Sequence, residues 1–246
     1  MSSPALQAKG LSHRYGAVQA VRGVDLTVHS GELLAMIGPN GAGKSTVFAL
    51  LAGDLPSAAA RIALHGQPIE KKSMQARAAA GLGRAYQTAA PFATLSVLDN
   101  LRVAATAFPA HAAQRLAALP QLLADSGLAG LQHEAVQNLP YADWKRLDLA
   151  LALAQQPRVL LLDEPTAGLA PSERSAMMHW VQRLAREQGL AVLFTEHNLD
   201  AVFAYASQVL VLVRGSVMAQ GAPGEVAANP QVQAAYTGGY TMPKAA

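Results

Sequence analysis

The feature that most constrains this chain is a glycine-rich segment set between an aliphatic run and a predicted helix. The segment matches the pattern G-x-x-x-x-G-K-[ST] and consists of Gly38, Pro39, Asn40, Gly41, Ala42, Gly43, Lys44, Ser45 and Thr46. Glycines let the backbone wrap closely, so that successive N–H groups and the amino end of a helix face phosphate oxygens. The pattern predicts a loop in which Lys44 contacts the β- and γ-phosphates of a nucleotide and Ser45 contacts Mg²⁺.

A second aliphatic run, Val159–Leu162, ends at two acidic residues. Asp163, at the tip of a buried strand, suits a further contact to Mg²⁺, often through water. Glu164 is placed to orient or deprotonate an attacking water. Two acidic residues after a strand can also be a solvated turn or a helix cap, but together with the phosphate loop they favour a nucleotide hydrolase.

Short runs that are apolar on both faces alternate with helix-like segments, and this alternation predicts an α/β core of three layers. The expected buried strands are Leu33–Ile37, Val159–Leu162, Val192–Thr195 and Val209–Val213. Two expected helices, Lys44–Ala52 and Ser172–Glu187, are followed by Gly53 and Gly189 as carboxyl-terminal caps. Residues 24–28 alternate in polarity, which indicates a small antiparallel sheet near the amino terminus.

The middle of the chain, from about Thr94 to Gln155, is rich in alanine, leucine and glutamine, and it predicts an inserted helical subdomain. The expected helix breaks are Pro109, Pro120, residues 127–130 and Pro140. The resulting division is a core of residues 1–87 and 157–225, a helical subdomain of 88–156 and a carboxyl-terminal tail of 226–246. The part after Tyr236 is expected to fray.

Composition removes several classes of protein. A chain of 246 residues that is 51% hydrophobic and 14% charged suits one large globular domain rather than a disordered one. The absence of cysteine excludes disulfide scaffolds, Cys-ligated zinc, iron–sulfur clusters and thiol catalysis. The net charge of +3 suits a weakly anionic partner such as a nucleotide or a membrane surface. Without a leader-like segment or an apolar run of roughly 20 residues, the expected location is cytosolic or peripheral to a membrane.

Several segments together resemble one family, the ATP-binding cassette (ABC) ATPases, in order and spacing. These are the phosphate loop, Gln87, Leu139–Asp143, Leu162–Thr166 and His197. The resemblance runs from about Ala5 to Gly238. It implies a RecA-like P-loop core with an amino-terminal antiparallel sheet and an inserted helical subdomain, and a dimer that sandwiches ATP and Mg²⁺.

The same resemblance implies roles for three single residues. Tyr15 is similar to the aromatic that stacks on adenine, although a core tyrosine is the equal alternative. Gln87 is similar to the glutamine that touches Mg²⁺ and the water. His197 is similar to the histidine that hydrogen-bonds the γ-phosphate and can steady Glu164. By composition alone, Gln87 would be a surface residue and His197 a structural one.

Within the family the chain resembles the ATPases of branched-chain amino-acid importers. The carrying segments are Tyr86–Gln87, Phe92–Leu101, Thr166–Leu169, Glu196–Leu199 and Asn229–Gly238. The implied partners are transmembrane permease subunits, a second ABC ATPase or a second copy of this chain, and indirectly a periplasmic solute-binding protein. No nucleic-acid partner is expected, and the implied location is the cytoplasmic face of the inner membrane. ATPases for urea or amide import and for lipopolysaccharide extraction look similar, so cargo rests on analogy.

The sequence differs from the usual family pattern in two segments that, by the resemblance, contact the nucleotide bound by the other subunit of the dimer. The signature loop, usually Leu-Ser-Gly-Gly-Gln, consists here of Leu139, Pro140, Tyr141, Ala142 and Asp143. Pro140 offers neither a hydroxyl nor an N–H to the opposite nucleotide, and Asp143 is expected to cap the helix from Trp144 to Gln155. Ala170 stands where Asp or Asn is usual. Two hypotheses remain open: a heterodimer with unequal sites, or a loop that works through its remaining N–H groups.

Three other classes of protein are less consistent with the sequence. Cassette proteins that remodel ribosomes or DNA usually carry two cassettes or long coiled-coil insertions, and this chain has neither. A P-loop kinase is disfavoured by Leu162–Thr166 and His197. An exporter remains open, although exporters commonly fuse the ATPase to its membrane domain.

Overall fold

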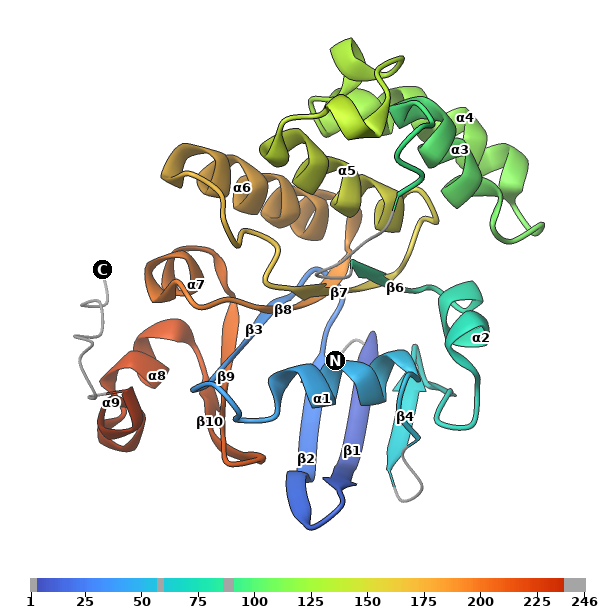
Figure 1. Cartoon of the computed structure of the whole chain (residues 1–246). Helices are drawn as coiled ribbons and strands as arrows, with labels where there is room; N and C mark the ends of the chain where they lie inside the picture. Colours follow the sequence, from blue (N-terminus) through green and yellow to red (C-terminus); the bar gives the residue numbers. More distant parts are fainter. Residues whose placement is uncertain (1–3, 57–59, 86–90, 237–246) are drawn as a thin grey trace.

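Two β-sheets organise the computed structural model, which describes residues 4–56, 60–85 and 91–236 (Figure 1). The first is a four-stranded antiparallel sheet in the order β2-β1-β4-β5. The second has six strands in the order β10-β9-β3-β8-β7-β6; its strands are parallel except that β10 runs antiparallel to β9. The strands are β1 Leu6–Tyr15, β2 Val18–Val28, β3 Leu33–Ile37, β4 Arg61–Leu64, β5 Gln67–Pro68, β6 Leu82–Ala85, β7 Val159–Asp163, β8 Ala191–Thr195, β9 Gln208–Val213 and β10 Ser216–Gly221.

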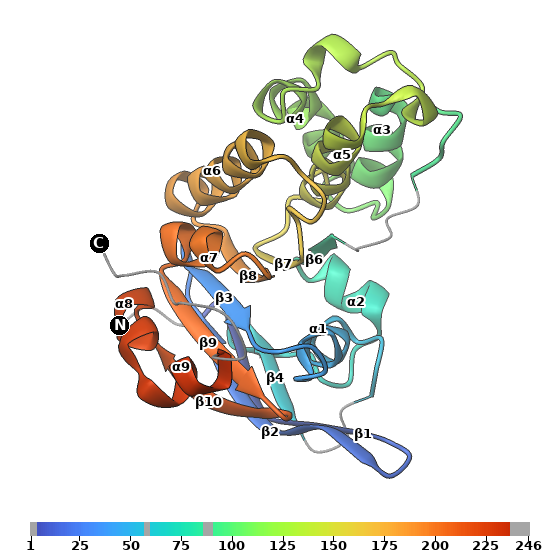
Figure 2. The ribbon, with the colours of Figure 1, turned by 60° about the vertical axis from the view of Figure 1, so that its left-hand side comes forward.

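The helices cover both faces of the larger sheet, and α3, α4 and α5 form a separate helical layer at one end of the molecule (Figures 1 and 2). They are α1 Lys44–Ala52, α2 Met74–Ala79, α3 Val97–Thr106, α4 Ala112–Asp125, α5 Tyr141–Leu153, α6 Pro171–Gln188, α7 Leu199–Tyr205, α8 Pro223–Ala228 and α9 Pro230–Tyr236, with short 3₁₀ turns at Ala129–Leu131 and Val136–Asn138. None of the helices in the described part of the chain is both long enough and apolar enough to cross a membrane.

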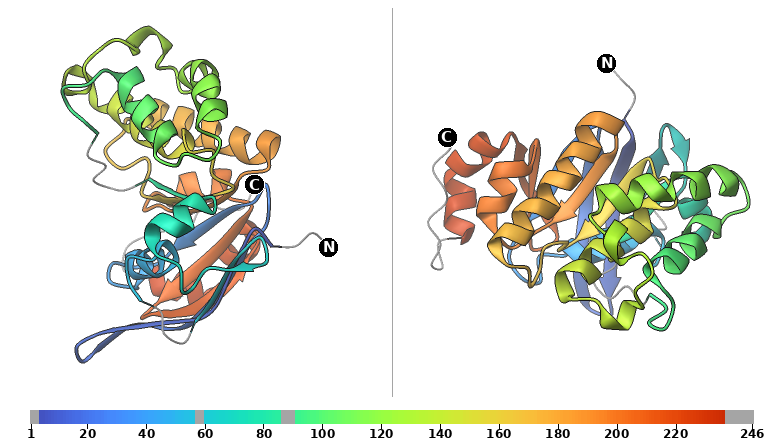
Figure 3. Two further views of the ribbon diagram at one scale, coloured as in Figure 1. Left: turned by 90° about the vertical axis from the view of Figure 1, so that its right-hand side faces the viewer. Right: turned by 90° about the horizontal axis from the view of Figure 1, so that it is seen from above.

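The larger sheet separates two hydrophobic cores because successive residues of a strand point to opposite faces. On β3, Leu34 and Met36 pack in the core that contains Phe48 of α1 and the antiparallel sheet. Ala35 and Ile37 pack in the core that contains α6 and the helical layer. The view from above shows α6 and the helical layer lying over the sheet (Figure 3). The predicted three-layer α/β architecture is confirmed.

Element boundaries follow the sequence signals closely in the core. α1 ends at Ala52 with Gly53 as its cap at φ 91°, and α6 ends one residue before Gly189 at φ 69°. The expected amino-terminal sheet exists, and its strand β2 is longer than the predicted 24–28. Residues 226–236 pack rather than hang free, because Val226 and Val232 are buried in the larger core. The part expected to fray, after Tyr236, lies outside the described residues.

Two sequence predictions in the helical layer were wrong. Pro120 lies inside α4 rather than at its end. A proline removes one N–H donor, and the burial of Leu119 and Leu123 on the same helix outweighs that loss. Asp143 does not cap α5: the capping position is Pro140, and the Asp143 carboxylate pairs with Arg146 at 2.8 Å in the first turn.

A buried arginine of α2 holds the carboxyl end of α1. The Arg77 side chain is 2% exposed, and its Nη1 donates to the carbonyl oxygens of Leu50 and Leu51, both at 2.7 Å. Its Nε and Nη2 donate to the carbonyls of Lys72 and Glu70 at 3.1 and 2.9 Å. One guanidinium therefore satisfies carbonyl groups that the end of α1 leaves unpaired.

Replacing Arg77 with methionine should lower the free energy of unfolding by about 3 kcal/mol, because several buried carbonyl groups lose their donor. Urea unfolding followed by circular dichroism measures the change. Arg102→Met is the matched control: Arg102 forms an exposed ion pair with Asp99, and its loss should cost less than about 1 kcal/mol. Equal losses in the two variants would contradict the capping role.

Candidate active site

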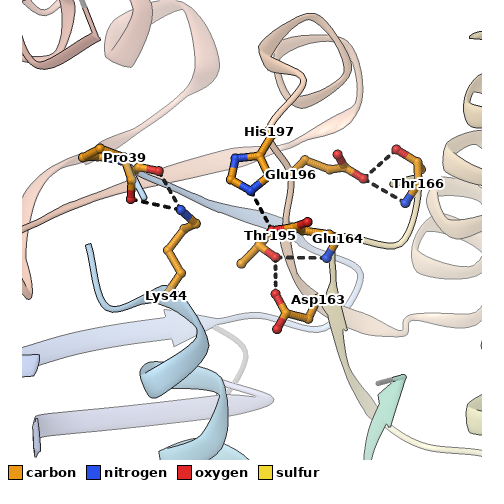
Figure 4. A network of polar contacts seen from close by, with 9 residues as sticks. Pro39, Lys44, Asp163, Glu164, Thr166, Thr195, Glu196 and His197 are labelled. Carbon is orange, nitrogen blue, oxygen red and sulfur yellow. Dashed lines mark hydrogen bonds and ion pairs between the residues drawn. The ribbon is translucent and has the colours of Figure 1, made fainter. Parts of the chain in front are cut away.

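Strand order brings three predicted loops to one edge of the larger sheet. β8 lies between β3 and β7, and the three strands are parallel, so their carboxyl ends meet at the same edge. The phosphate loop follows β3, Asp163 ends β7 with Glu164 directly after it, and His197 follows β8. Figure 4 shows Lys44, Glu164 and His197 around this edge.

The phosphate loop has the backbone conformation that its glycines permit. Gly41 and Gly43 have φ values of 77° and 104°, which L side chains rarely adopt. A Cβ atom at Gly43 would lie 2.5 Å from the carbonyl oxygen of Ala20, so only glycine fits there. α1 begins directly after Gly43 without a side-chain cap. The N–H groups of its first turn, which have no intrahelical acceptor, are therefore free to bind an anion.

The Lys44 ammonium group lies against the phosphate loop. The side chain is 8% exposed, and its Nζ donates to the carbonyl oxygens of Gly38 at 2.6 Å and Pro39 at 3.3 Å (Figure 4). Burial lowers the pKa of Lys44, while the charges of Glu164 and Asp163 act in the opposite direction. An ammonium held by neutral carbonyls beside free helix N–H groups is a donor set that fits a triphosphate.

A threonine that sequence reasoning gave no role fixes the two acidic residues. Thr195 of β8 is fully buried, and its hydroxyl donates to Asp163 Oδ1 at 2.6 Å. The Thr195 hydroxyl oxygen also accepts a hydrogen bond from the backbone N–H of Glu164 at 3.0 Å. Glu164 itself has a φ of 51°, unusual for a residue with a side chain. The turn at Glu164 points the Asp163 and Glu164 carboxylates in different directions, and Thr195 of the neighbouring strand β8 holds this turn in place.

A second unpredicted contact joins the loops that follow β7 and β8. Glu196 Oε1 accepts from both the backbone N–H and the hydroxyl of Thr166, at 3.0 and 2.6 Å (Figure 4). Both side chains are almost fully buried. A buried carboxylate with two donors is a strong, geometrically specific link. The sequence carries no signal for this pair, because the contact depends on β7 and β8 being neighbours in the sheet.

His197 lies against Glu164, as the sequence resemblance suggested. His197 Nε2 is 2.6 Å from Glu164 Oε1, and the two side chains are 52% and 22% exposed. The imidazole therefore contacts the carboxylate while half of its surface stays open to solvent. An exposed histidine that orients a carboxylate is placed to interact with a further polar group.

The magnesium partners predicted from the sequence are Ser45, Asp163 and Gln87. Ser45 is the second residue of α1 and is exposed, and Asp163 ends β7 with its Oδ1 held by Thr195. One hydroxyl and one carboxylate, completed by substrate phosphates and water, fit the way proteins bind Mg²⁺. Gln87 lies outside the described residues.

Tyr15 is not a core residue, so the alternative weighed for it is wrong. It ends β1 with a 52% exposed ring, which meets His13 edge-on at 4.6 Å between ring centroids. The exposed face leaves the ring open to stacking. Whether adenine is the group that stacks there stays a prediction.

The signature loop from Leu139 to Asp143 sits at the amino end of α5, in the helical layer. The Tyr141 hydroxyl donates to the carbonyl of Ala167 at 3.0 Å, and its ring packs on Gly168, where a Cβ would lie 3.0 Å from the ring. The loop is thereby tied within this chain to the segment that follows Glu164. Ala170 is the residue preceding α6, and its N–H donates to Glu173 at 2.9 Å.

The fold and this set of loops define a P-loop nucleotide-binding domain. Comparison of the sequence with family models matches residues 21–167 to the model described as ABC transporter, and residues 216–240 to the model described as branched-chain amino acid ATP-binding cassette transporter. The chain belongs to the ABC transporter family, as an ATP-binding domain.

Three relatives place the chain within that family. It is 32% identical to the high-affinity branched-chain amino acid transport ATP-binding protein BraF of Pseudomonas aeruginosa, over 97% of this chain and 99% of BraF. It is 35% identical to the lipopolysaccharide export system ATP-binding protein LptB of Escherichia coli, over 95% and 97% of the two chains. A crystal structure of the ADP conformation of an ABC transporter's ATP-binding cassette superposes with a TM-score of 0.86 at 26% identity, covering 96% of this chain and 99% of the cassette.

Replacing Thr195 with valine should lower ATP hydrolysis at least about tenfold, since it leaves Asp163 Oδ1 without its hydroxyl donor and removes the shorter of the two contacts that the Glu164 N–H makes with residue 195. The same loss should cost about 1–3 kcal/mol of stability. Steady-state phosphate release and urea unfolding measure the two effects. Thr195→Ser keeps the hydroxyl and is the matched control. A valine variant as active as the serine variant would show that the link does not position Glu164.

Proposed function

We propose that this chain is the ATP-hydrolysing subunit that energises an ABC importer of branched-chain or other amino acids. The observation that carries the hydrolase is the 2.6 Å contact between His197 and Glu164 at the mouth of the phosphate loop. The cargo class is supported by the full-length similarity to BraF and by the match of residues 216–240 to a branched-chain amino acid transporter model.

Each residue of the site has a part in the proposed reaction. Lys44 and the N–H groups of α1 bind the phosphates, and Tyr15 stacks on adenine. Ser45, Asp163 and Gln87 hold Mg²⁺, which neutralises charge that develops on the phosphate oxygens. Glu164 orients or deprotonates the attacking water, and His197 holds the Glu164 carboxylate and the γ-phosphate together. Thr195 keeps Asp163 and Glu164 in the required directions.

The signature loop acts on a nucleotide bound by a second ATPase. Because Pro140 has neither a hydroxyl nor an N–H, this chain contributes less to its partner's site than the partner contributes to this one. A heterodimer with unequal sites follows, held at the cytoplasmic face of the inner membrane by permease subunits and served indirectly by a periplasmic solute-binding protein. Closing of the dimer on ATP and reopening after phosphate release would move the permease between two access states.

Co-purification at native expression tests the transporter assignment. The chain should be recovered from detergent-solubilised membranes with two permease chains and a second ABC ATPase. The complex, reconstituted in vesicles with its solute receptor, should then accumulate leucine when ATP is supplied. Recovery in the soluble fraction alone, or with ribosomes, would contradict the proposal that the chain is a subunit of a transporter.

Lipopolysaccharide extraction is the second candidate function, and the 35% identity to LptB favours it. The same purification separates the two functions. A complex with lipopolysaccharide-binding membrane proteins and no solute receptor would replace amino-acid import by lipid extraction.

The unequal-site hypothesis has its own test in the reconstituted complex. Glu164→Gln in this chain should abolish transport, because its site receives the partner's signature loop. The equivalent substitution in the partner should reduce transport less. Equal losses would mean that the loop around Pro140 works normally through its remaining N–H groups.

A further inference from the structure

A cavity of about 480 Å³ lies at the opposite edge of the larger sheet from the phosphate loop. Arg158 and Leu190, which immediately precede β7 and β8, line it, so it sits at the amino ends of strands whose carboxyl ends carry the catalytic residues. Most of its other walls come from α4, from the carboxyl half of α6, and from the end of α5 with the residues that follow it. Figure 2 shows these two helices as neighbours. The cavity is therefore separate from the nucleotide site, and it is shared by the helical layer and the core.

A buried positive charge faces this cavity. Arg115 of α4 is 7% exposed; its Nε donates to the carbonyl of Ala105 at 2.7 Å and its Nη2 to the carbonyl of Phe108. Both partners are neutral, and none of the ion pairs among residues 4–56, 60–85 and 91–236 includes Arg115. Because a buried charge without a counter-charge is costly, an anion bound in the cavity would stabilise this guanidinium.

The rim of the cavity carries a basic and an acidic side chain, Arg158 and Asp125. Arg158 is exposed at the rim. His65 also lines the cavity; its pKa is lowered first by its own burial and second by the charge of Arg158. Asp125, on α4, accepts a hydrogen bond from Gln121 at 2.9 Å. Within the described part of the chain, one buried guanidinium without a counter-charge lies beside one acidic rim residue, and this suits a single negative charge rather than a phosphate dianion.

The remaining wall is apolar. Leu119, Leu184, Leu190 and Trp180 line the cavity, and each is at most 6% exposed. A volume of this size falls in the range of small-molecule sites, and an aliphatic chain would bury its surface against these side chains. Within the described residues the buried Trp180 indole N–H has no hydrogen-bond partner, so this otherwise apolar wall carries one unsatisfied donor.

From this juxtaposition of a buried unpaired guanidinium with an aliphatic wall, we propose that the cavity binds a monocarboxylate with a medium-length apolar tail. The carboxylate pairs with Arg115 and Arg158, and the tail lies along Leu119, Leu184 and Trp180. Such a ligand touches α4 and α6 at once, so it fixes the helical layer relative to the core.

Octanoate is the probe, and Trp180 is the reporter. The chain has two tryptophans, so a Trp144→Phe background leaves Trp180 as the single fluorophore. Titration with octanoate should change the fluorescence saturably. Ala118→Phe, which fills the cavity from α4, should weaken binding at least about tenfold, whereas Ala117→Phe, exposed on the same helix and outside the cavity lining, should not.

Thermal unfolding separates lost binding from lost folding. Octanoate should raise the melting temperature of the unsubstituted chain and of Ala117→Phe, but not of a folded Ala118→Phe. Arg158→Gln, at the exposed rim, should weaken octanoate binding about threefold without loss of folding. The uncharged 1-octanol should bind at least about tenfold more weakly than octanoate. Non-saturable titration, equal binding of 1-octanol, or binding unaffected by Ala118→Phe would each overturn the proposal.

Discussion

Replacing Glu164 with glutamine should lower ATP hydrolysis by about a hundred- to ten-thousandfold and leave ATP binding intact. The amide has the size of the carboxylate and can still meet His197, whose Nε2 lies 2.6 Å from Glu164 Oε1. It cannot accept a proton from water. Because Lys44 and the N–H groups of α1 are untouched, the phosphates should bind as before. Single-turnover phosphate release and fluorescent-nucleotide titration measure the two quantities.

Glu187→Gln is the matched control, since Glu187 lies exposed near the end of α6, far along the helix from the catalytic loops. It should hydrolyse ATP at the unsubstituted rate. If Glu164→Gln kept more than about a tenth of that rate, another group would have to act as the base. If it lost nucleotide affinity as well, Glu164 would serve binding rather than the chemical step.

The core of this site could be predicted because its signals are local. An aliphatic run that stops at Gly38 or at Asp163 fixes a buried strand and the loop at its carboxyl end. Gly53 and Gly189 mark helix ends for the same reason, since each takes a left-handed conformation that favours glycine. The phosphate loop and the carboxylate pair needed no knowledge of tertiary structure.

The supporting contacts could not be predicted because they depend on which strands are neighbours. Thr195 holds Asp163, and Glu196 holds Thr166, only because β8 lies beside β7 in the sheet. In sequence, a threonine and a glutamate after a strand are indistinguishable from an ordinary turn. Of the residues at the carboxyl end of β8, the family resemblance assigned a role to His197 alone.

The buried cations were missed for a related reason. Arg77 and Arg115 lie on alanine-rich helices, where a basic residue normally indicates a solvated face. The structure buries both, with carbonyl groups as partners. Pro120 predicted a helix break, but α4 continues through it, because burial of Leu119 and Leu123 outweighs the low helix propensity of proline.

A buried carboxylate in α5 gives the chain a pH-dependent stability. Asp148 is 8% exposed, and burial raises its pKa from 3.8 to about 7, although the charge of Lys145 acts to lower it. Between these two pH values the folded state holds a proton that the unfolded state releases. The free energy of unfolding should therefore fall as pH rises from about 4 to about 7.

Asp148→Asn should remove this dependence, because an amide carries no charge to desolvate. At a pH of about 8 the variant should be more stable than the unsubstituted chain by on the order of 3 kcal/mol, and near pH 4 the two should be equal. Urea unfolding at a series of pH values measures the difference. Lys145→Met removes the charge that lowers the pKa, so its stability should fall over a window that extends to higher pH. A constant offset between Asp148→Asn and the unsubstituted chain at every pH would show that Asp148 is ionised in the folded state, and burial would then not govern its titration.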